Sequence, residues 1–475
     1  MKSVWVLAGH DPFGGAGVHA DIRVAASFGA SLRTILTSDT SQNDRKFYAA
    51  QTPSLDWLTN QLRALYDQET PAAVKVGLLV DEGSVRFIAE QTFDCPLIVD
   101  PVFASSSGKS FVSSEIISAL KEYLWPKISL LTPNRPEAEK LVGFSIETLA
   151  DVRRAAADLR RQGLKAVLIK GGHAESDKLF DFFDDGQRSF ILEARRVEGS
   201  YRGTGCTLSS AIACSLAEGH DLRDSVVLAH SYVQAAIRQA HAKGSNHLPS
   251  LHTAPPFSPL FYDEPFEVQF PKMPRALGFY VVAPDAEWID RLARAKVPTL
   301  QLRAKDFSGE ALHDEIRKAK SACERSGSNF FLNDDWQAAI THQTFGLHLG
   351  QEDLDALSPV DLAQLAHAQI RLGISTHSIE EAARAKALNP SYIALGPVFE
   401  TTCKSMRFGP QGIEKVGTWV KRLGGIPVVA IGGLKREHAE PLIAEGADGI
   451  AVISDITSSA DPESRVNEWL KAWRN

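Results

Sequence analysis

The chain has 475 residues, more than one ordinary hydrophobic core supports, so we expect two or three domains. Apolar residues make up 44% and charged residues 23%, which excludes a disordered or fibrous chain. The formal net charge of -7 gives no electrostatic basis for binding nucleic acid.

The cysteines indicate a reduced, cytoplasmic enzyme. They stand at positions 95, 206, 214, 323 and 403, with no CxxC pair and no disulfide or zinc spacing. The glycine-rich N-terminus is unlike a secretory leader, and no apolar run reaches the roughly 18 residues of a membrane helix. We therefore expect a cytoplasmic protein whose partners are small molecules, without nucleic acid or membrane. The sequence leaves a homo-oligomer open.

Residues 1–245 alternate short apolar runs with helical patterns. The predicted strands are Val4–Ala8, Thr34–Thr37, Ala73–Val76, Leu97–Asp100, Leu130–Thr132 and Ala166–Lys170. The predicted helices are 17–28, 54–66, 82–91, 113–124, 135–142 and 147–162. The alternation predicts an α/β sandwich with a mainly parallel sheet. The turn at 184–186 predicts an added antiparallel hairpin of Phe180–Phe183 and Phe190–Leu192.

A proline-rich segment over 246–275 follows, which we interpret as a linker because such a proline density excludes a helix interior or a central strand. Residues 276–475 are more regular, with one helical segment after each short strand. The predicted strands are Phe279–Ala283, Leu300–Arg303, Phe330–Asn333, Gly346–Leu349, Leu372–Ser375, Tyr392–Leu395, Val428–Ile431 and Gly449–Ile453. Eight such units predict a (β/α)8 barrel.

The first domain carries polar residues at successive strand ends, where open α/β sheets bind ligands. Gly203 and Gly205 open a helix whose free N–H groups suit the charge on a transferring phosphoryl group. An acid, an amide, a second acid and a lysine follow other strands: Asp100, Asn134, Glu137 and Lys170. Each alone could be a turn or cap residue, but together they indicate a site for phosphate and Mg²⁺.

In the barrel, the ligands should gather where the strands end. Asp334 and Asp353 follow neighbouring strands and could meet at one Mg²⁺, although either alone could cap a helix. Arg303, Lys305 and Lys404 face the same end, which indicates a metal-bridged diphosphate. The glycines at 432–433 and the Ile453–Ser454 end of the last strand indicate a second phosphate.

Six segments of the barrel closely resemble thiamine-phosphate synthase. They are QLRAK (301–305), LNDD (332–335), HLGQEDL (348–354), GISTHS (373–378), LGPVF (395–399) and VAIGG (429–433). The resemblance implies joining hydroxymethylpyrimidine diphosphate to hydroxyethylthiazole phosphate. In that chemistry pyrophosphate leaves first, the aminopyrimidine stabilises the resulting cation, and the thiazole nitrogen captures it.

The resemblance also assigns roles to residues. The pyrimidine diphosphate would be held by Gln301, Leu302, Arg303, Ala304, Lys305, Asn333, Ser375 and Lys404. Asp334 and Asp353 would bind Mg²⁺. The thiazole phosphate would be held by Thr401, Thr402, Cys403, Gly433, Ile453 and Ser454. Cys403 stands where the family usually has threonine.

The first domain resembles the ribokinase-like superfamily, and within it hydroxymethylpyrimidine and hydroxymethylpyrimidine-phosphate kinase. The resemblance rests on residues 9–21, on Thr40 to Asn43 and on the Gly203 to Cys206 motif. It implies ATP as the phosphoryl donor. It makes Cys206 the base, with a pKa lowered by the helix N-terminus, although Cys206 could be only a small buried residue. Asp21 and Gln42 would bind the aminopyrimidine edge.

Three departures weaken the kinase resemblance. Asp39, Asp44 and Arg202 stand where the family usually has leucine, threonine and histidine. The main interpretation is an enzyme whose kinase half supplies the diphosphate that the barrel consumes. One alternative keeps the barrel as the enzyme and makes the first domain a non-catalytic pyrimidine-binding module. Another makes both halves phosphate-binding folds for other metabolites. The sequence does not tell which of the two phosphorylations occurs.

Overall fold

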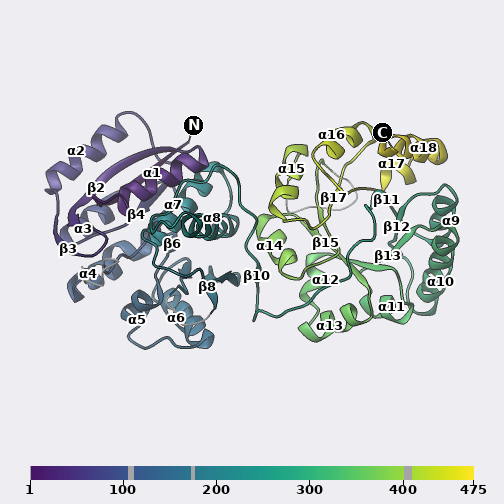
Figure 1. Ribbon diagram of the computed structural model, residues 1–475, viewed down its shortest axis with the longest axis horizontal. Helices are drawn as coiled ribbons and strands as arrows, with labels where there is room; N and C mark the ends of the chain where they lie inside the picture. Colours follow the sequence, from purple (N-terminus) through teal and green to yellow (C-terminus); the bar gives the residue numbers. More distant parts are fainter. Residues whose placement is uncertain (1, 105–111, 173–176, 401–408, 475) are drawn as a thin grey trace. The chain divides into compact units, whose positions relative to one another are not determined.

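The computed structural model describes residues 2–104, 112–172, 177–400 and 409–474 (Figure 1). Contacts divide the chain into two compact units, Met1–Pro265 and Phe266–Asn475. In the described residues, no helix is long and apolar enough to cross a membrane.

The first unit is built on one sheet with the strand order β10-β9-β8-β7-β6-β5-β4-β1-β2-β3. Its strands are β1 Ser3–His10, β2 Ser31–Gln42, β3 Phe47–Gln51, β4 Ala73–Val76, β5 Leu97–Val99, β6 Leu130–Leu131, β7 Val167–Ile169, β8 Lys178–Asp184, β9 Ser189–Arg195 and β10 Leu260–Phe261. Strands β2, β1, β4, β5, β6 and β7 are parallel, and β3, β8, β9 and β10 pair antiparallel at the edges. The predicted mainly parallel sheet is confirmed.

Helices cover both faces of this sheet because its central strands are apolar on both sides. They are α1 Gly17–Phe28, α2 Leu55–Tyr66, α3 Glu82–Glu90, α4 Ser114–Ala119, α5 Arg135–Val142, α6 Leu149–Arg161, α7 Thr204–Glu218 and α8 Leu222–Ala242. Helices α1, α7 and α8 pack together on one face. On the other face, Trp5 and Leu7 of β1 join a core with residues of α2 to α6. The functional residues emerge at the carboxyl ends of the parallel strands.

The second unit is a closed barrel of eight parallel strands. These are β11 Gly278–Ala283, β12 Thr299–Leu302, β13 Asn329–Asn333, β14 Gly346–Leu349, β15 Arg371–Thr376, β16 Tyr392–Leu395, β17 Val428–Ile431 and β18 Gly449–Val452. The surrounding helices are α9 Ala286–Arg294, α10 Gly309–Ser326, α11 Trp336–Thr341, α12 Gln351–Asp355, α13 Pro359–His367, α14 Ile379–Ala387, α15 Ile413–Arg422, α16 Ala439–Ala444, α17 Ser454–Thr457 and α18 Pro462–Arg474. The predicted (β/α)8 barrel is confirmed.

The proline-rich segment is bound to folded structure along much of its length. Within the first unit, β10 pairs with β9, and the Pro259 carbonyl accepts a hydrogen bond from the Glu193 N–H at 3.1 Å. Within the second unit, the Pro271 carbonyl accepts from the Ser391 hydroxyl at 2.6 Å. Proline lacks an N–H group but keeps its carbonyl, so these residues dock as acceptors at the edges of each unit.

Candidate active sites

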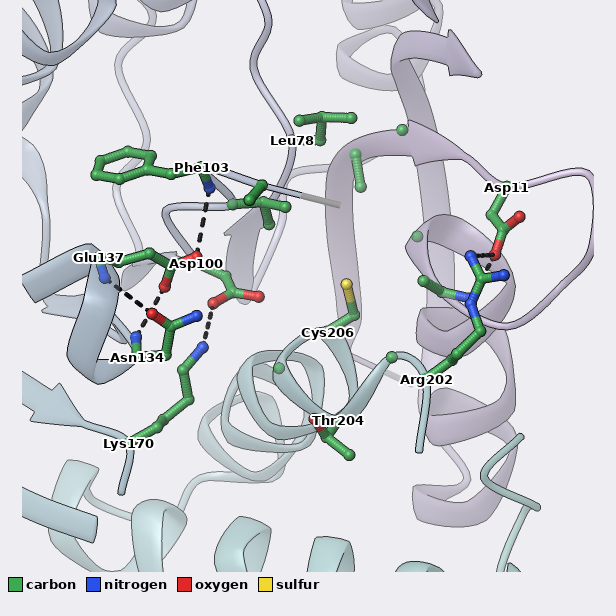
Figure 2. A pocket seen from close by; sticks show the side chains of 18 of the residues that line it. Asp11, Leu78, Asp100, Phe103, Asn134, Glu137, Lys170, Arg202, Thr204 and Cys206 are labelled. Carbon is green, nitrogen blue, oxygen red and sulfur yellow. Dashed lines mark hydrogen bonds and ion pairs between the residues drawn. The ribbon is translucent and has the colours of Figure 1, made fainter. Parts of the chain in front are cut away.

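A cavity of about 500 Å³ lies at the carboxyl ends of the parallel strands of the first unit (Figure 2). Its lining brings together eight of the nine residues predicted for this half: Gln42, Asp100, Asn134, Glu137, Lys170, Gly203, Gly205 and Cys206. These residues come from β2, from the ends of β5, β6 and β7, and from the start of α7. The ninth, Asp21, does not line the cavity.

The start of α7 lies on the cavity wall, in a geometry suited to an anion. Gly203 is its N-cap residue at φ 72°, a conformation that favours glycine, and offers no side chain to the first-turn N–H groups. A Cβ on Gly205 would lie 3.0 Å from Lys170 Nζ and 3.1 Å from Asp100 Oδ2, so a side chain there would crowd the charged groups. Backbone N–H groups and a lysine therefore face the same space, as phosphoryl binding requires.

Cys206 lies between two groups of charged residues. Figure 2 shows its sulfur between the Asp100–Lys170 pair on one side and the Asp11–Arg202 pair on the other. Burial raises the pKa of the Cys206 thiol to about 11; the Lys75 ammonium opposes this rise. The prediction that the helix N-terminus lowers the pKa of Cys206 is therefore wrong, because desolvation outweighs the effect of the helix.

We expect slow alkylation of Cys206 at neutral pH. Only the thiolate reacts, so the rate with iodoacetamide should rise about tenfold per pH unit between pH 7 and 10. Peptide mapping of the alkylated full-length chain measures this rate, with the Cys206→Ala chain identifying the peptide. A fast reaction at pH 7.5 that stays flat above pH 8 would contradict the raised pKa.

Asp100 and Lys170 form the charged centre of the other cavity wall. Lys170 Nζ lies 2.7 Å from Asp100 Oδ1, and the Thr132 hydroxyl donates to the same oxygen at 3.3 Å. Burial raises the pKa of Glu137 to about 7; Lys170 opposes this rise, and the Asp100 carboxylate adds to it. The Asp100 and Glu137 carboxylates are neighbours, and burial raises the pKa of Glu137. The pair fits a divalent cation, which would relieve the repulsion between the two carboxylates.

Asn134 and Glu137 also cap helix α5. Asn134 Oδ1 accepts from the Glu137 N–H at 2.9 Å, and Glu137 Oε2 accepts from the Asn134 N–H at 2.7 Å. This capping box is the purely structural role that the sequence left open for these residues. Both residues also line the cavity, so the cap holds them at its wall.

Asp21 belongs to a buried ion pair beside the cavity. Its carboxylate accepts from Lys75 Nζ at 3.0 Å and from the Ser210 hydroxyl at 2.5 Å. The side chains of Asp21 and Lys75 are both 0% exposed. Lys75 was not among the predicted site residues, although a lysine within the apolar run Ala73–Val76 is a visible signal for a buried partner.

The departures Asp44 and Arg202 are partners of one another. Arg202 Nη1 donates to Asp44 Oδ1 at 2.8 Å, and Nη2 reaches both Asp11 Oδ2 and Gln42 Oε1 at 3.3 Å. The Arg202 side chain is 6% exposed, so this guanidinium is almost wholly buried beside its acceptors. His247, in the predicted linker, also lies 3.1 Å from Asp44. Two substitutions that look disruptive one at a time form a matched pair.

Asp39, the third departure, lies away from this group. Its carboxylate pairs with His10 Nδ1 at 2.8 Å and its side chain is 70% exposed.

We expect Arg202→Met to destabilise the first unit by about 2 kcal/mol, because Asp11 and Asp44 lose the guanidinium that pairs with both. Asp44→Asn should lower the free energy of unfolding by less in the Arg202→Met variant than in the unmodified protein, because the ion pair is already broken there. Urea unfolding followed by far-ultraviolet circular dichroism measures both. Arg33→Met is the matched control, since Arg33 and its partner Glu69 are 39% and 29% exposed, and the loss of this pair should cost under about 1 kcal/mol. Additive losses would show that the two residues are not a pair.

In the barrel, the structure brings Lys305, Asp334 and Asp353 together. Lys305 Nζ forms an ion pair with Asp334, and the Gly350 N–H donates to Asp353 at 3.1 Å. Burial raises the pKa of Asp353, and the neighbouring Asp334 carboxylate raises it further. Among the described residues no cluster of three or more His, Cys, Asp or Glu could hold a metal. Two carboxylates are nevertheless a sufficient protein ligand set for Mg²⁺ when substrate phosphates complete it.

Two other predicted barrel residues, Gln301 and Ser375, form hydrogen bonds with buried side chains in the barrel interior. Gln301 donates to Tyr280, and the Ser375 hydroxyl lies 2.7 Å from His348 Nε2. Burial lowers the pKa of His348 to about 4, against the opposing charge of Asp353.

The remaining predicted barrel residues fall into two groups. Arg303, Ala304, Asn333, Gly433, Ile453 and Ser454 lie at or just after strand ends, and Leu302, the last residue of β12, is fully buried. Thr401, Thr402, Cys403 and Lys404 lie outside the described residues.

Comparisons with known proteins match both units. The phosphomethylpyrimidine kinase family matches residues 11–250, and the thiamine monophosphate synthase family matches residues 279–456. The chloroplastic thiamine biosynthetic bifunctional enzyme of Arabidopsis thaliana is 30% identical over 482 residues, covering 96% of this chain and 90% of the relative. Thiamine-phosphate synthase of Neisseria meningitidis serogroup B is 43% identical over 204 residues, covering 43% of this chain and 98% of the relative.

Among solved structures, phosphomethylpyrimidine kinase from Clostridium difficile 630 is 30% identical with a TM-score of 0.45, covering 51% of this chain and all of that chain. Because the match to the Arabidopsis enzyme spans nearly the whole chain, in the same domain order, the relationship is not confined to one half. The chain belongs to the family of bifunctional thiamine biosynthetic enzymes, with a phosphomethylpyrimidine kinase unit followed by a thiamine-phosphate synthase barrel.

Proposed function

We propose that the first unit transfers a phosphoryl group from ATP to hydroxymethylpyrimidine or its phosphate, and that the barrel couples the resulting diphosphate to hydroxyethylthiazole phosphate. The single observation that supports the kinase step is the cavity in which Cys206, the start of α7 and the Asp100–Lys170 pair converge. Phosphoryl transfer needs a base for the attacking hydroxyl, an anion site and a carboxylate for Mg²⁺ within one small volume.

In the kinase unit, Cys206 would take the proton from the attacking hydroxyl. Its raised pKa makes the thiolate a strong base but a scarce one at neutral pH. The first-turn N–H groups of α7 and Lys170 would stabilise the negative charge on the transferring group. Asp100 and Glu137 would hold Mg²⁺, which would neutralise the nucleotide phosphates.

At the pyrimidine end, Gln42 has both ends of its amide held in place. Its Oε1 accepts from Arg202, and its Nε2 donates to the Thr40 hydroxyl at 3.0 Å. This fixes which atoms it offers to a pyrimidine. Asp21 would act through Lys75, which is held beside the cavity, and not by direct contact.

In the barrel, Arg303, Lys305 and Lys404 would neutralise the departing diphosphate, with Asp334 and Asp353 holding Mg²⁺. Gly433, Ile453 and Ser454, at the ends of the last two strands, would bind the thiazole phosphate together with Thr401, Thr402 and Cys403. Catalysis would come from positioning and charge stabilisation, because the proposed chemistry uses no protein nucleophile.

We also propose a cytoplasmic location, supported by the four free cysteines among the described residues.

The deciding experiment is a coupled assay of the full chain with hydroxymethylpyrimidine, ATP, Mg²⁺ and thiazole phosphate. We expect thiamine phosphate and pyrophosphate. A second assay without thiazole phosphate follows ADP release and separates the mono- and diphosphate products. Thiamine phosphate made from supplied diphosphate, with pyrimidine binding but no ADP release, would instead make the first unit a non-catalytic module.

A further inference from the structure

Five polar side chains form one hydrogen-bonded chain through the barrel interior. Gln301 Nε2 donates to the Tyr280 hydroxyl at 2.9 Å, and this hydroxyl lies 3.0 Å from that of Tyr392. The Tyr392 hydroxyl lies 2.7 Å from His348 Nδ1, and His348 Nε2 lies 2.7 Å from Ser375 Oγ. The hydrogen-bonded chain therefore joins Gln301 and Ser375, two of the residues that the family resemblance places against the pyrimidine diphosphate. This inference rests on the proposed synthase function.

This chain is almost closed to solvent. Tyr392 is 0% exposed, Tyr280 1%, Gln301 4% and His348 7%. A buried polar group without a partner costs about 1–3 kcal/mol, so each hydrogen in the chain must meet an acceptor. This requirement gives the chain one direction.

The direction follows from the Gln301 end. An amide nitrogen only donates, so the Tyr280 oxygen accepts, and the Tyr280 hydrogen must go to the Tyr392 oxygen. The Tyr392 hydrogen then goes to His348 Nδ1, which must be unprotonated. A neutral His348 carries its hydrogen on Nε2 and donates it to Ser375 Oγ.

The other protonation state breaks the chain. An imidazolium at His348 would also donate to Tyr392, which would turn the Tyr392 hydrogen back toward Tyr280. The Tyr280 hydrogen would then have no acceptor among the described residues. With Gln301 Nε2 as the donor to Tyr280, the Nε2–H form of His348 is the form that satisfies every member.

Packing holds the two tyrosines in this arrangement. The Phe331 ring lies edge-on to Tyr392, with centroids 5.3 Å apart, and 6.0 Å from Tyr280. Gly373 leaves room for the Tyr392 ring, because a Cβ there would overlap it.

We propose that Tyr280, Tyr392 and His348 are positioning residues. They determine which atom at each end of the hydrogen-bonded chain, on Gln301 and on Ser375, donates to the substrate and which accepts from it. Ser375 Oγ already accepts from His348, so its own hydrogen donates to an acceptor on the substrate. Gln301 uses its Nε2 within the chain, so its carbonyl oxygen accepts from the substrate. An aminopyrimidine has the matching pair, because its ring nitrogens accept and its amino group donates.

The first test is a double-mutant cycle on the full-length protein, in which KM for the pyrimidine diphosphate is measured. We expect Ser375→Ala to raise this KM about tenfold and Tyr392→Phe to raise it nearly as much, because each removes one hydrogen bond. The double variant should raise this KM by less than the product of the two single effects, because part of the Tyr392 effect passes through Ser375. The KM for thiazole phosphate should not change. Tyr280→Phe is the second variant if Tyr392→Phe does not fold.

Phe331→Leu is the matched control, because it alters the packing of both tyrosines and removes no hydrogen bond. Any effect of Phe331→Leu on KM should be of similar size for both substrates. For the pyrimidine diphosphate it should multiply with the effect of Ser375→Ala. If Tyr392→Phe also multiplies with Ser375→Ala, or leaves KM unchanged, the positioning role is overturned.

The second test needs no substrate and separates this inference from the proposed function. The ¹⁵N chemical shifts of ¹⁵N-histidine-labelled full chain report the tautomer of His348, assigned by comparison with His348→Gln. We expect a protonated Nε2 and an unprotonated Nδ1, and a mixture of tautomers in Tyr392→Phe. A protonated Nδ1 in the unmodified chain overturns the proposal, even if thiamine phosphate is made. The expected tautomer without thiamine phosphate would instead place the failure in the proposed function.

Discussion

Cys206→Ala should lower kinase turnover by about 10²- to 10⁴-fold, because it removes the proposed base from the cavity. Thiamine phosphate synthesis from supplied pyrimidine diphosphate should be unchanged, because that step belongs to the barrel. ADP release measures the first activity and pyrophosphate release the second, in the same full-length preparation. The barrel activity therefore serves as an internal measure of intact protein.

Cys214→Ala is the matched control for this substitution. Cys214 lies two turns along the same helix α7, is fully buried and does not line the cavity. Its loss should cost only about 1 kcal/mol of stability and leave kinase turnover intact. If Cys206→Ala also keeps near-normal turnover, Cys206 is only a small residue at a helix start, as the sequence allowed.

The architecture could be predicted from the sequence because most strands carry a strong local signal. Ala73–Val76 was predicted with the bounds that β4 has, and all eight barrel strands were predicted in order. Strand β3, Phe47–Gln51, was missed because only Phe47 is buried and no alternation marks it. Strand β10 lies among prolines, where a local reading favours a linker over an edge strand.

The site was predictable where its residues follow strand ends and unpredictable where it depends on distant partners. Parallel strands end at one edge, so Asp100 and Lys170 could be placed together before any contact was known. Asp21 and Lys75 are 54 residues apart and Asp44 and Arg202 are 158 apart, and no local pattern pairs them. Burial in the folded unit also decides the Cys206 pKa, which desolvation raises although the helix N-terminus suggested the opposite.

Asp334→Asn should reduce thiamine phosphate synthesis by about a thousandfold and leave kinase turnover unchanged. The substitution removes one of two proposed Mg²⁺ ligand charges, and the diphosphate leaves only when its charge is neutralised. Pyrophosphate release from supplied diphosphate and thiazole phosphate measures the loss. Added Mg²⁺ should restore part of the rate, because the weakened site should still bind the ion at higher concentration.

Asparagine is a better replacement here than alanine because of the backbone. Asp334 has φ 65°, in the left-handed region that asparagine tolerates and alanine does not. Asp334→Ala would therefore mix backbone strain with the loss of a ligand.

The neighbouring Asp335→Asn is the matched control. Its carboxylate accepts from the Ala338 N–H at 2.8 Å as the N-cap of α11, so this variant tests a structural role one residue away. It should leave synthesis near normal, because asparagine is also a good N-cap residue. Equal losses in both variants would mean that the loop after β13 matters for its shape. A loss confined to Asp334→Asn and Asp353→Asn, each eased by Mg²⁺, would identify the carboxylate pair as the metal site, because the same loss of charge at Asp335 would have had no effect.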